Sequence, residues 1–263
     1  MSAGASLSLA WQVVGAFTYL DHPVVLAIAH RGGAGDWPEN TFPAFQAAID
    51  LGYRYLETDV HATSDGVLVA FHDDRLDRVT DRSGAIGRLS YAEVARARVG
   101  GTERIPRLSD LLDAFPEARF NIDAKADSSV EPLISIIEKM GVLDRVCVGS
   151  FSDRRIGALR RALGGGLCHS LGPAGVARLR AASYGVPVGR IAAPCVQVPP
   201  TTQGRTLIDR RFVATAHARN MQVHVWTVDD PIEMHRLLEL GVDGIMTDRP
   251  GVLRDVLIER GQW

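Results

Sequence analysis

The sequence predicts an α/β protein with the architecture of a (β/α)8 TIM barrel and a small insertion after the hairpin of the second strand. Short apolar runs alternate with amphipathic helical stretches between about residues 24 and 247, which is typical of a parallel sheet with crossover helices. Eight such runs can be counted, the number that closes a barrel. The length of 263 residues suits a single barrel domain. A doubly wound sheet is the alternative, and the strand count disfavours it.

The first strand is expected at 24–29, because this continuous apolar run is typical of a strand buried on both faces. The stretch FPAFQAAIDLG then predicts a helix that ends at Gly52. We expect Asn40 or Thr41 to cap this helix rather than to contact a ligand.

The second strand is expected at 55–60 and leads into a hairpin. An apolar return over 67–71 forms the antiparallel arm, which stands outside the count of eight. A two-residue turn at Asp65-Gly66 would place Asp59 directly opposite His72.

Six further strands alternate with helices in the rest of the chain. The strands are expected at 119–124, 145–150, 166–170, 190–198, 222–227 and 243–247. The helices are expected near 129–140, 153–163, 173–182, 206–219 and 231–240. Two of the helix starts carry capping boxes, Ser128 with Glu131 and Asp230 with Glu233.

Residues 75–107 interrupt the alternation of strands and helices. They contain several glycines and one short predicted helix, which starts at the Ser90–Glu93 capping box. We interpret the segment as an insertion that is too small for a core of its own and that forms a lid or wall over the barrel mouth.

The barrel domain is placed at 24–263, and residues 1–23 form an N-terminal helical segment. The stretch 6–20 is apolar but too short to span a bilayer. A short amphipathic helix covering the barrel floor is the favoured interpretation, and contact with a membrane surface is the alternative.

Composition excludes some classes of partner. The net charge of −2 and the absence of a basic stripe argue against nucleic acid as the main partner. The three cysteines are few and odd in number, so no disulfide framework is indicated and a cytoplasmic location is favoured. The sequence does not indicate an oligomeric state.

The candidate chemistry begins with Glu57 and Asp59, two carboxylates one residue apart at the end of the second strand. Residues two apart in a strand point to the same side, so both acids project to one place. With His72 returned beside them by the hairpin, they would form a metal site with a proton-transfer group.

The ends of other strands should contribute further polar residues to the same end of the barrel, because reacting groups in such barrels lie at the carboxyl ends of the strands. His30 and Arg31 end the first strand. Asp123 and Lys125 share a face at the end of the third strand, and Lys125 is one of only two lysines. His224 and Trp226 share a face on the seventh. His169 and His224 could line the pocket, whereas we expect His22, His61, His217 and His235 to lie in the loops, in the hairpin or on helix surfaces.

At these positions the sequence resembles the glycerophosphodiester phosphodiesterases. The motifs HRG with PENT, ETD, a DG turn leading to HD, IDAK, VWTV and GVDGIMTDRP follow one another in order across about residues 24–250. The resemblance implies cleavage of glycerophosphodiesters to glycerol 3-phosphate and an alcohol, with one divalent cofactor ion, Mg²⁺ ahead of Ca²⁺, in glycerophospholipid breakdown. The implied partner is therefore a small-molecule substrate.

The resemblance also implies roles for individual residues. His30 and His72 would be the catalytic acid and base, in an order that the sequence does not assign. Arg31 and Lys125 would hold phosphate and Trp226 would line the pocket. The metal ligands would be Glu57, Asp59 and Asp123.

One residue departs from the family pattern. Position 123 is Asp where the family more often has Glu, and the related sphingomyelinase-D-type phospholipases carry Asp there. The shorter side chain means that the metal must lie closer to the third strand or be reached through water.

Two alternative functions stay open. A lysophospholipase D would act on single-chain phospholipids and would need an apolar groove beyond the phosphate. A barrel that binds phosphodiesters without cleaving them belongs to a different class, and the presence of both histidines and all three carboxylates speaks against it.

Overall fold

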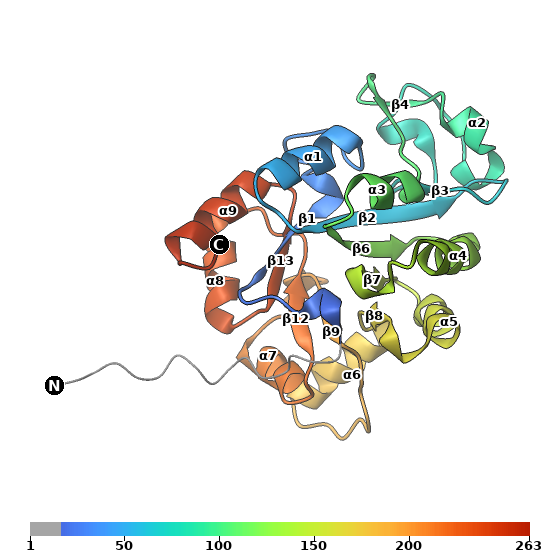
Figure 1. Cartoon of the computed structure of the whole chain (residues 1–263). Coiled ribbons are helices and arrows are strands. Elements are labelled where there is room, and N and C mark those ends of the chain that lie inside the picture. Colours follow the sequence, from blue (N-terminus) through green and yellow to red (C-terminus); the bar gives the residue numbers. More distant parts are fainter. Residues whose placement is uncertain (1–16) are drawn as a thin grey trace.

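The computed structural model describes residues 17–263, which form a barrel of eight parallel strands surrounded by helices (Figure 1). The barrel strands are β1 (Leu26–Ala29), β2 (Tyr55–Ala62), β6 (Arg119–Ala124), β7 (Val146–Gly149), β8 (Cys168–His169), β9 (Cys195–Val198), β12 (Gln222–Val225) and β13 (Gly244–Thr247). The larger outer helices are α1 (Phe42–Asp50), α3 (Leu108–Ala114), α4 (Val130–Met140), α5 (Asp153–Leu163), α6 (Pro173–Ser183), α7 (Arg210–His217), α8 (Pro231–Leu240) and α9 (Pro250–Glu259). The predicted fold class is confirmed.

The strands run in the order β8-β7-β6-β2-β1-β13-β12-β9, so the first and last strands of the chain pair with each other. The ring is completed between β8 and β9, where Ser170 bridges to Cys195 and the Leu171 amide donates to the Cys195 carbonyl at 3.1 Å. A large apolar cluster fills the space between the strands and the outer helices, and a second one lies inside the barrel.

The predicted boundaries of the barrel strands hold to within two residues except for one strand, and one predicted helix also differs. The predicted strand 190–198 is too long, because only Cys195–Val198 pairs with a neighbour. The helix expected at 206–219 is shorter, Arg210–His217, and a small hairpin of β10 (Thr201–Thr202) and β11 (Arg205–Thr206) precedes it.

The hairpin after β2 differs from its predicted register. β3 (Leu68–Ala70) pairs with β2 so that His61 lies opposite Val69, which places Phe71 rather than His72 opposite Asp59. The connection holds three residues, because Thr63 pairs with Val67 and its hydroxyl accepts the Val67 amide at 3.0 Å. Gly66 supplies the positive φ of +82° that this turn requires.

The helix starts confirm some of the predicted caps and contradict others. Ser90 and Glu93 form the predicted capping box at α2 (Tyr91–Val94). Asp230 caps α8 by accepting the Ile232 amide, but Glu233 pairs with Arg236 instead of returning to the cap. Two further predicted caps are not formed. Ser128 does not cap α4, because a 3-10 turn precedes this helix. Thr41 stands at the start of α1, but its side chain accepts no hydrogen bond from the helix.

The insertion is anchored to the hairpin. Besides α2 it contains a short ribbon of β4 (Arg98–Val99) and β5 (Glu103–Arg104), and it stands at one end of the barrel beside β3 (Figure 1). Its buried side chains pack on Val69 and Phe71 of the hairpin; they are Leu76, Ile86, Val94, Ala97, Val99 and Ile105. The segment therefore shares an apolar cluster with the arm that carries His72.

The floor of the barrel is covered by the turn Thr18–Leu20, where Tyr19 is buried against the inner cluster. The helix expected at 6–20 falls for the most part outside the described residues. Within residues 17–263, the structure has no helix with the length and apolar character needed to cross a membrane.

Candidate active site

Polar side chains from several strands converge at the carboxyl end of the barrel. β2 and β6 run parallel and in register, so Glu57 lies beside Asn121 and Asp59 lies beside Asp123. Glu57 and Asp59 are both at most 4% exposed. The predicted same-face arrangement of the acids is confirmed, since alternate residues of each strand point into the barrel.

Lys125 links two of these carboxylates. Its Nζ lies 2.9 Å from Asp59 Oδ1 and 3.0 Å from Asp123 Oδ2. Burial alone would favour the neutral amine, but the two carboxylates outweigh it and raise the pKa of Lys125. The lysine is therefore a fixed positive charge at the mouth.

Arg31 contacts the same group from the end of β1. Its Nε lies 3.0 Å from Asp59 Oδ2, and its backbone amide donates to Glu57 Oε2 at 3.0 Å. Arg31 adopts a positive φ of 53°, in the left-handed region that few residues with side chains occupy. This turn aims both its amide and its guanidinium at the carboxylates.

The carboxylates differ in how readily they ionise. Burial, with the adjacent charge of Asp59, raises the pKa of Glu57. Burial also raises the pKa of Asp123, although Lys125 opposes it. For Asp59 the balance is reversed, because Lys125 and Arg31 outweigh the effect of burial and lower its pKa. Burial therefore favours the protonated forms of Glu57 and Asp123, whereas its two cationic partners favour the ionised form of Asp59.

The donor set fits a divalent cation in its chemistry, because hard cations prefer carboxylate oxygens. Asp123 Oδ1 is buried and has no hydrogen-bond partner, which leaves one oxygen free to bind an ion. The three acids are less tightly gathered than a bound ion requires, since among the described residues only a group of cysteines brings its ligand atoms within 4.8 Å of one another. Binding a cation would therefore draw Glu57, Asp59 and Asp123 together.

His30 stands between two acids. Its Nδ1 lies 2.7 Å from Asp248 Oδ1 at the end of β13, and its Nε2 lies 3.7 Å from Glu57 Oε2. Burial would lower the pKa of His30, but Glu57 and Asp248 outweigh it and raise this pKa. The contact with Asp248 leaves Nε2 as the ring atom that faces the mouth.

His72 follows Phe71 at the end of the hairpin arm and is more exposed than His30. Its Nδ1 lies 2.6 Å from Asp73 Oδ1, so Nε2 is again the free ring nitrogen. Although the register is shifted by one residue, His72 remains near Asp59, because the amide of the preceding Phe71 donates to the Asp59 carbonyl at 2.9 Å.

A chain of ion pairs joins the surroundings of the two histidines. Arg78, in the insertion, contacts Asp73 at 2.6 Å and Glu39 at 2.7 Å. Glu39 in turn lies 3.3 Å from Arg31. Glu39 thus connects Arg31 to Arg78, a residue for which the sequence predicted no part in the site.

Asn40 is a site residue that the sequence reasoning assigned to a helix cap. Its amide nitrogen lies 3.4 Å from Asp59 Oδ2, and its amide oxygen accepts the Thr58 hydroxyl at 2.8 Å. Asn40 has a φ of 57°, which turns its side chain into the barrel mouth instead of onto the helix start. The enrichment of Asn at positive φ was the available signal.

Trp226 lies at the end of β12 and packs edge-on against Phe151, with ring centroids 5.6 Å apart. Phe151 is 66% exposed, and Lys125 Nζ lies 5.8 Å from the centre of its ring. The two rings therefore form an apolar wall beside the charged residues. His224 is buried deeper in the barrel, between Gln197 and Gln222.

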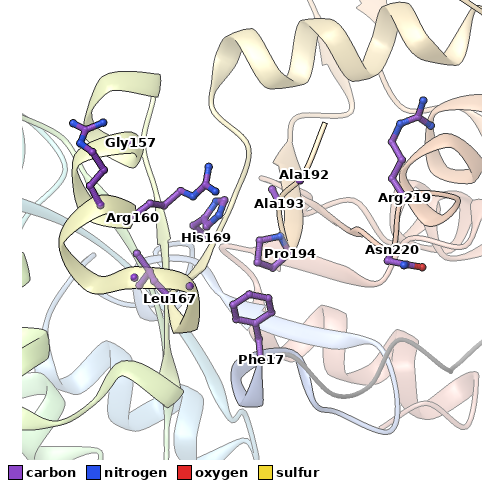
Figure 2. A pocket seen from close by; sticks show the side chains of 13 residues that line it. Phe17, Gly157, Arg160, Leu167, His169, Ala192, Ala193, Pro194, Arg219 and Asn220 are labelled. Atoms are coloured by element: carbon purple, nitrogen blue, oxygen red, sulfur yellow. The ribbon is translucent and has the colours of Figure 1, made fainter. Parts of the chain in front are cut away.

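Two cavities within residues 17–263 lie away from these residues. The first, of about 620 Å³, opens at the opposite end of the barrel and is lined by Arg160, His169, Pro194 and Arg219 among others (Figure 2). His169 therefore faces the floor and not the candidate site. We place the active site from the convergence of charged groups, since neither of these two cavities is lined by any of them.

Comparisons with known proteins agree with this geometry. The model of the glycerophosphoryl diester phosphodiesterase family matches residues 30–252. Probable glycerophosphodiester phosphodiesterase 2 of Mycobacterium tuberculosis is 45% identical over 254 residues, which cover 93% of this chain and 95% of that protein. Lysophospholipase D GDPD1 of Mus musculus is 30% identical, with 88% and 85% covered. The fold is similar to that of an Oleispira antarctica phosphodiesterase solved with the product sn-glycerol 3-phosphate, with a TM-score of 0.76, 22% identity and coverage of 89% and 97%.

Proposed function

The chain belongs to the glycerophosphoryl diester phosphodiesterase family, and we propose that it hydrolyses glycerophosphodiesters to glycerol 3-phosphate and an alcohol with two histidines and one divalent cation. It is a phosphoric diester hydrolase. The observation that carries the proposal is the convergence of His30, Glu57, Asp59 and Asp123 at one barrel mouth. Glycerophosphodiesters are phospholipids without their acyl chains, so this reaction would follow deacylation in glycerophospholipid breakdown.

The charged residues suit an anionic diester. A phosphodiester repels an attacking oxygen, so its hydrolysis depends on positioning and on stabilising the charge that develops. Arg31 and Lys125 are cations beside the carboxylates, and they would bind the phosphate oxygens. Glu57, Asp59 and Asp123 would hold the cation, Mg²⁺ ahead of Ca²⁺, which when bound supplies polarisation of a phosphoryl oxygen.

The histidines suit proton transfer at defined atoms. The attacking oxygen must lose a proton and the leaving alkoxide must gain one, and imidazole ionises near neutral pH. Asp248 and Asp73 each engage an Nδ1, so the proton would move at Nε2 of both His30 and His72. The assignment of acid and base is left open between the two rings.

The test is an assay of the metal-stripped protein on a panel of glycerophosphodiesters, with Mg²⁺, Ca²⁺ or Mn²⁺ added back and the products identified. We expect activity to be lost on chelation, restored by one of the ions, and accompanied by release of glycerol 3-phosphate. Full activity after exhaustive chelation would contradict the role of the cation. Binding of the diesters without any cleavage would favour a phosphodiester-binding barrel.

A lysophospholipase D activity is the second candidate. Its support is the 30% identity to a mouse lysophospholipase D and the exposed apolar wall of Phe151 and Trp226, which could receive part of an acyl chain. The ratio of kcat/KM for lysophosphatidylcholine to that for glycerophosphocholine distinguishes the two activities. A ratio well above one would favour the lipid substrate.

A further inference from the structure

The three cysteines of the chain meet at one point inside the barrel. Cys147, Cys168 and Cys195 come from the neighbouring strands β7, β8 and β9, and their sulfur atoms all lie within 4.8 Å of one another. Cys147 Sγ and Cys195 Sγ are 3.8 Å apart. All three side chains are at most 1% exposed.

This spacing matches sulfur atoms that share a metal ion. A metal–sulfur bond of about 2.3 Å places two sulfurs of a tetrahedral zinc site roughly 3.8 Å apart. A disulfide bond is only about 2.05 Å long, so the thiols as they stand are not bonded to each other. Small shifts of the side chains would bring the sulfurs to bonding distance from one ion.

A buried hydroxyl with no partner lies in the same cluster. Tyr19 packs with the three cysteines beneath the barrel, and its Oη is buried without a hydrogen-bond partner. Burial, and after it the nearby Cys147, raise the pKa of this hydroxyl. A buried donor without an acceptor is costly, and a thiolate–metal centre would supply that acceptor or use the oxygen as a fourth ligand.

One of the three cysteines, Cys168, borders a cavity of about 320 Å³ on the barrel floor, which is also lined by Tyr19, Leu143 and Asp144. Because the cysteine side chains are at most 1% exposed, an ion would reach the sulfurs from this side only after a small local opening of the floor. Arg119 donates to the Tyr19 carbonyl and so holds this part of the floor in place.

The cluster contains none of the carboxylates of the candidate active site, because the group of ligand atoms within 4.8 Å of one another consists of the three cysteines alone. Cys147 pairs with Asn121 on β6, and Asn121 in turn pairs with Glu57 on β2. Gln197 donates to Asn121 at 2.8 Å and contacts His224, so amide and imidazole side chains neighbour the cysteines at this level of the barrel. Sulfur ligands also select a different class of ion from carboxylates.

We propose that Cys147, Cys168 and Cys195 form a second metal site, which binds one thiophilic ion of the Zn²⁺ and Cu⁺ class on the floor of the barrel. Binding replaces three S–H bonds with three metal–sulfur bonds and releases three protons to solvent. The bound ion would join β7, β8 and β9 and so reinforce the ring at its weakly paired β8–β9 junction.

The test uses the reduced full-length protein and Cd²⁺ as a spectroscopic probe for Zn²⁺. We expect one equivalent of ion to remain after desalting, a sulfur-to-metal charge-transfer absorption in the ultraviolet, and a higher melting temperature. The chain has three cysteines in all, so the absorption reports on this site alone. Cys168→Ser and Cys195→Ser should each weaken binding more than about 100-fold, because outer-shell partners are already worth about 10- to 100-fold.

Asp59→Asn is the matched control, since it alters the carboxylate site and should leave the absorption unchanged. If a serine variant does not fold, alkylation of the wild-type protein decides the question, because a bound ion should protect all three thiols. The proposal is overturned if Cd²⁺ gives no charge-transfer absorption, if the serine variants bind as tightly as wild type, or if alkylation is equally fast with and without the ion. The cysteines would then be small apolar residues that only fill the barrel.

Discussion

His30 Nδ1 lies 2.7 Å from Asp248 Oδ1, although 218 positions separate the two residues in the sequence. The contact exists because β1 and β13 pair in parallel, with Ala29 beside Thr247. The carboxylate fixes the ring orientation and leaves Nε2 facing the acids of β2. Asp248 is therefore a positioning residue for the histidine.

Asp248→Asn should lower kcat by about 10- to 100-fold and change KM little, because asparagine keeps the shape but removes the charge that orients the imidazole. His30→Ala should cost more, about 10²–10⁴-fold, the usual contribution of a positioned acid or base. Steady-state kinetics on glycerophosphocholine measures both. Equal losses in the two variants would show that Asp248 does more than position the ring.

His72→Ala should also lower kcat by about 10²–10⁴-fold, while the affinity for a non-hydrolysable diester changes much less. His235→Ala is the matched control, because His235 lies on α8 and its nearest acid is Glu259 at 3.7 Å. The comparison needs kcat for both variants and a binding isotherm for the diester. Near-normal turnover in His72→Ala would assign this histidine a structural role.

Arg78→Ala should reduce kcat/KM by about tenfold with little change in melting temperature. Arg78 holds Asp73 beside His72 and Glu39 beside Arg31, yet its side chain is about half exposed, so its loss removes little buried surface. Arg75→Ala is the control, because Arg75 pairs with Asp77 away from this chain of contacts. Identical kinetics in the two variants would exclude a positioning role for Arg78.

The stability of the protein should fall slightly as pH rises through the pKa of His217. Asp243 lies 2.8 Å from His217 Nε2 and raises the pKa of this histidine above its ordinary 6.5. The ion pair is complete below pH 6.5 and is lost as the folded-state histidine deprotonates at higher pH. Because the pair is partly exposed, its contribution should stay below about 1 kcal/mol.

The measurement for this pair is urea unfolding of wild type and His217→Gln at pH 5.5 and pH 8, chosen as points on either side of the transition. The stability difference between the two proteins should be larger at the lower pH. A difference that does not depend on pH would show that protonation of His217 does not contribute.

Much of the barrel could be predicted from the sequence because its signals are local. A strand buried on both faces is a continuous apolar run, and alternation within a strand is enough to place Glu57 with Asp59 on one side. The eight strands and the inward direction of the acids follow from these two patterns alone. Helices α3 and α9 were not predicted, because α3 lies between the insertion and the third strand and α9 follows the last strand, so neither connects two successive predicted strands.

The features that were not predicted depend on contacts between individual side chains or strands, which the apolar periodicity of the sequence does not reveal. The hairpin register is set by the Thr63 hydroxyl, which extends the turn by one residue. Asn40 leaves its expected cap because its backbone is left-handed and Thr58 holds its amide. The cysteine cluster depends on how β7, β8 and β9 are staggered around the barrel, which no single strand reveals.

The pairing of the first strand with the last also sets the order in which the protein becomes an enzyme during synthesis. Most of the candidate site, from His30 to Lys125, is present once the first half of the chain has been made. Asp248, however, reaches His30 only when β13 takes its place beside β1. A nascent chain that still lacks its last strand therefore carries the carboxylates and both histidines without the residue that orients one of them. The orientation of His30 by Asp248 is thus completed only when the ring closes.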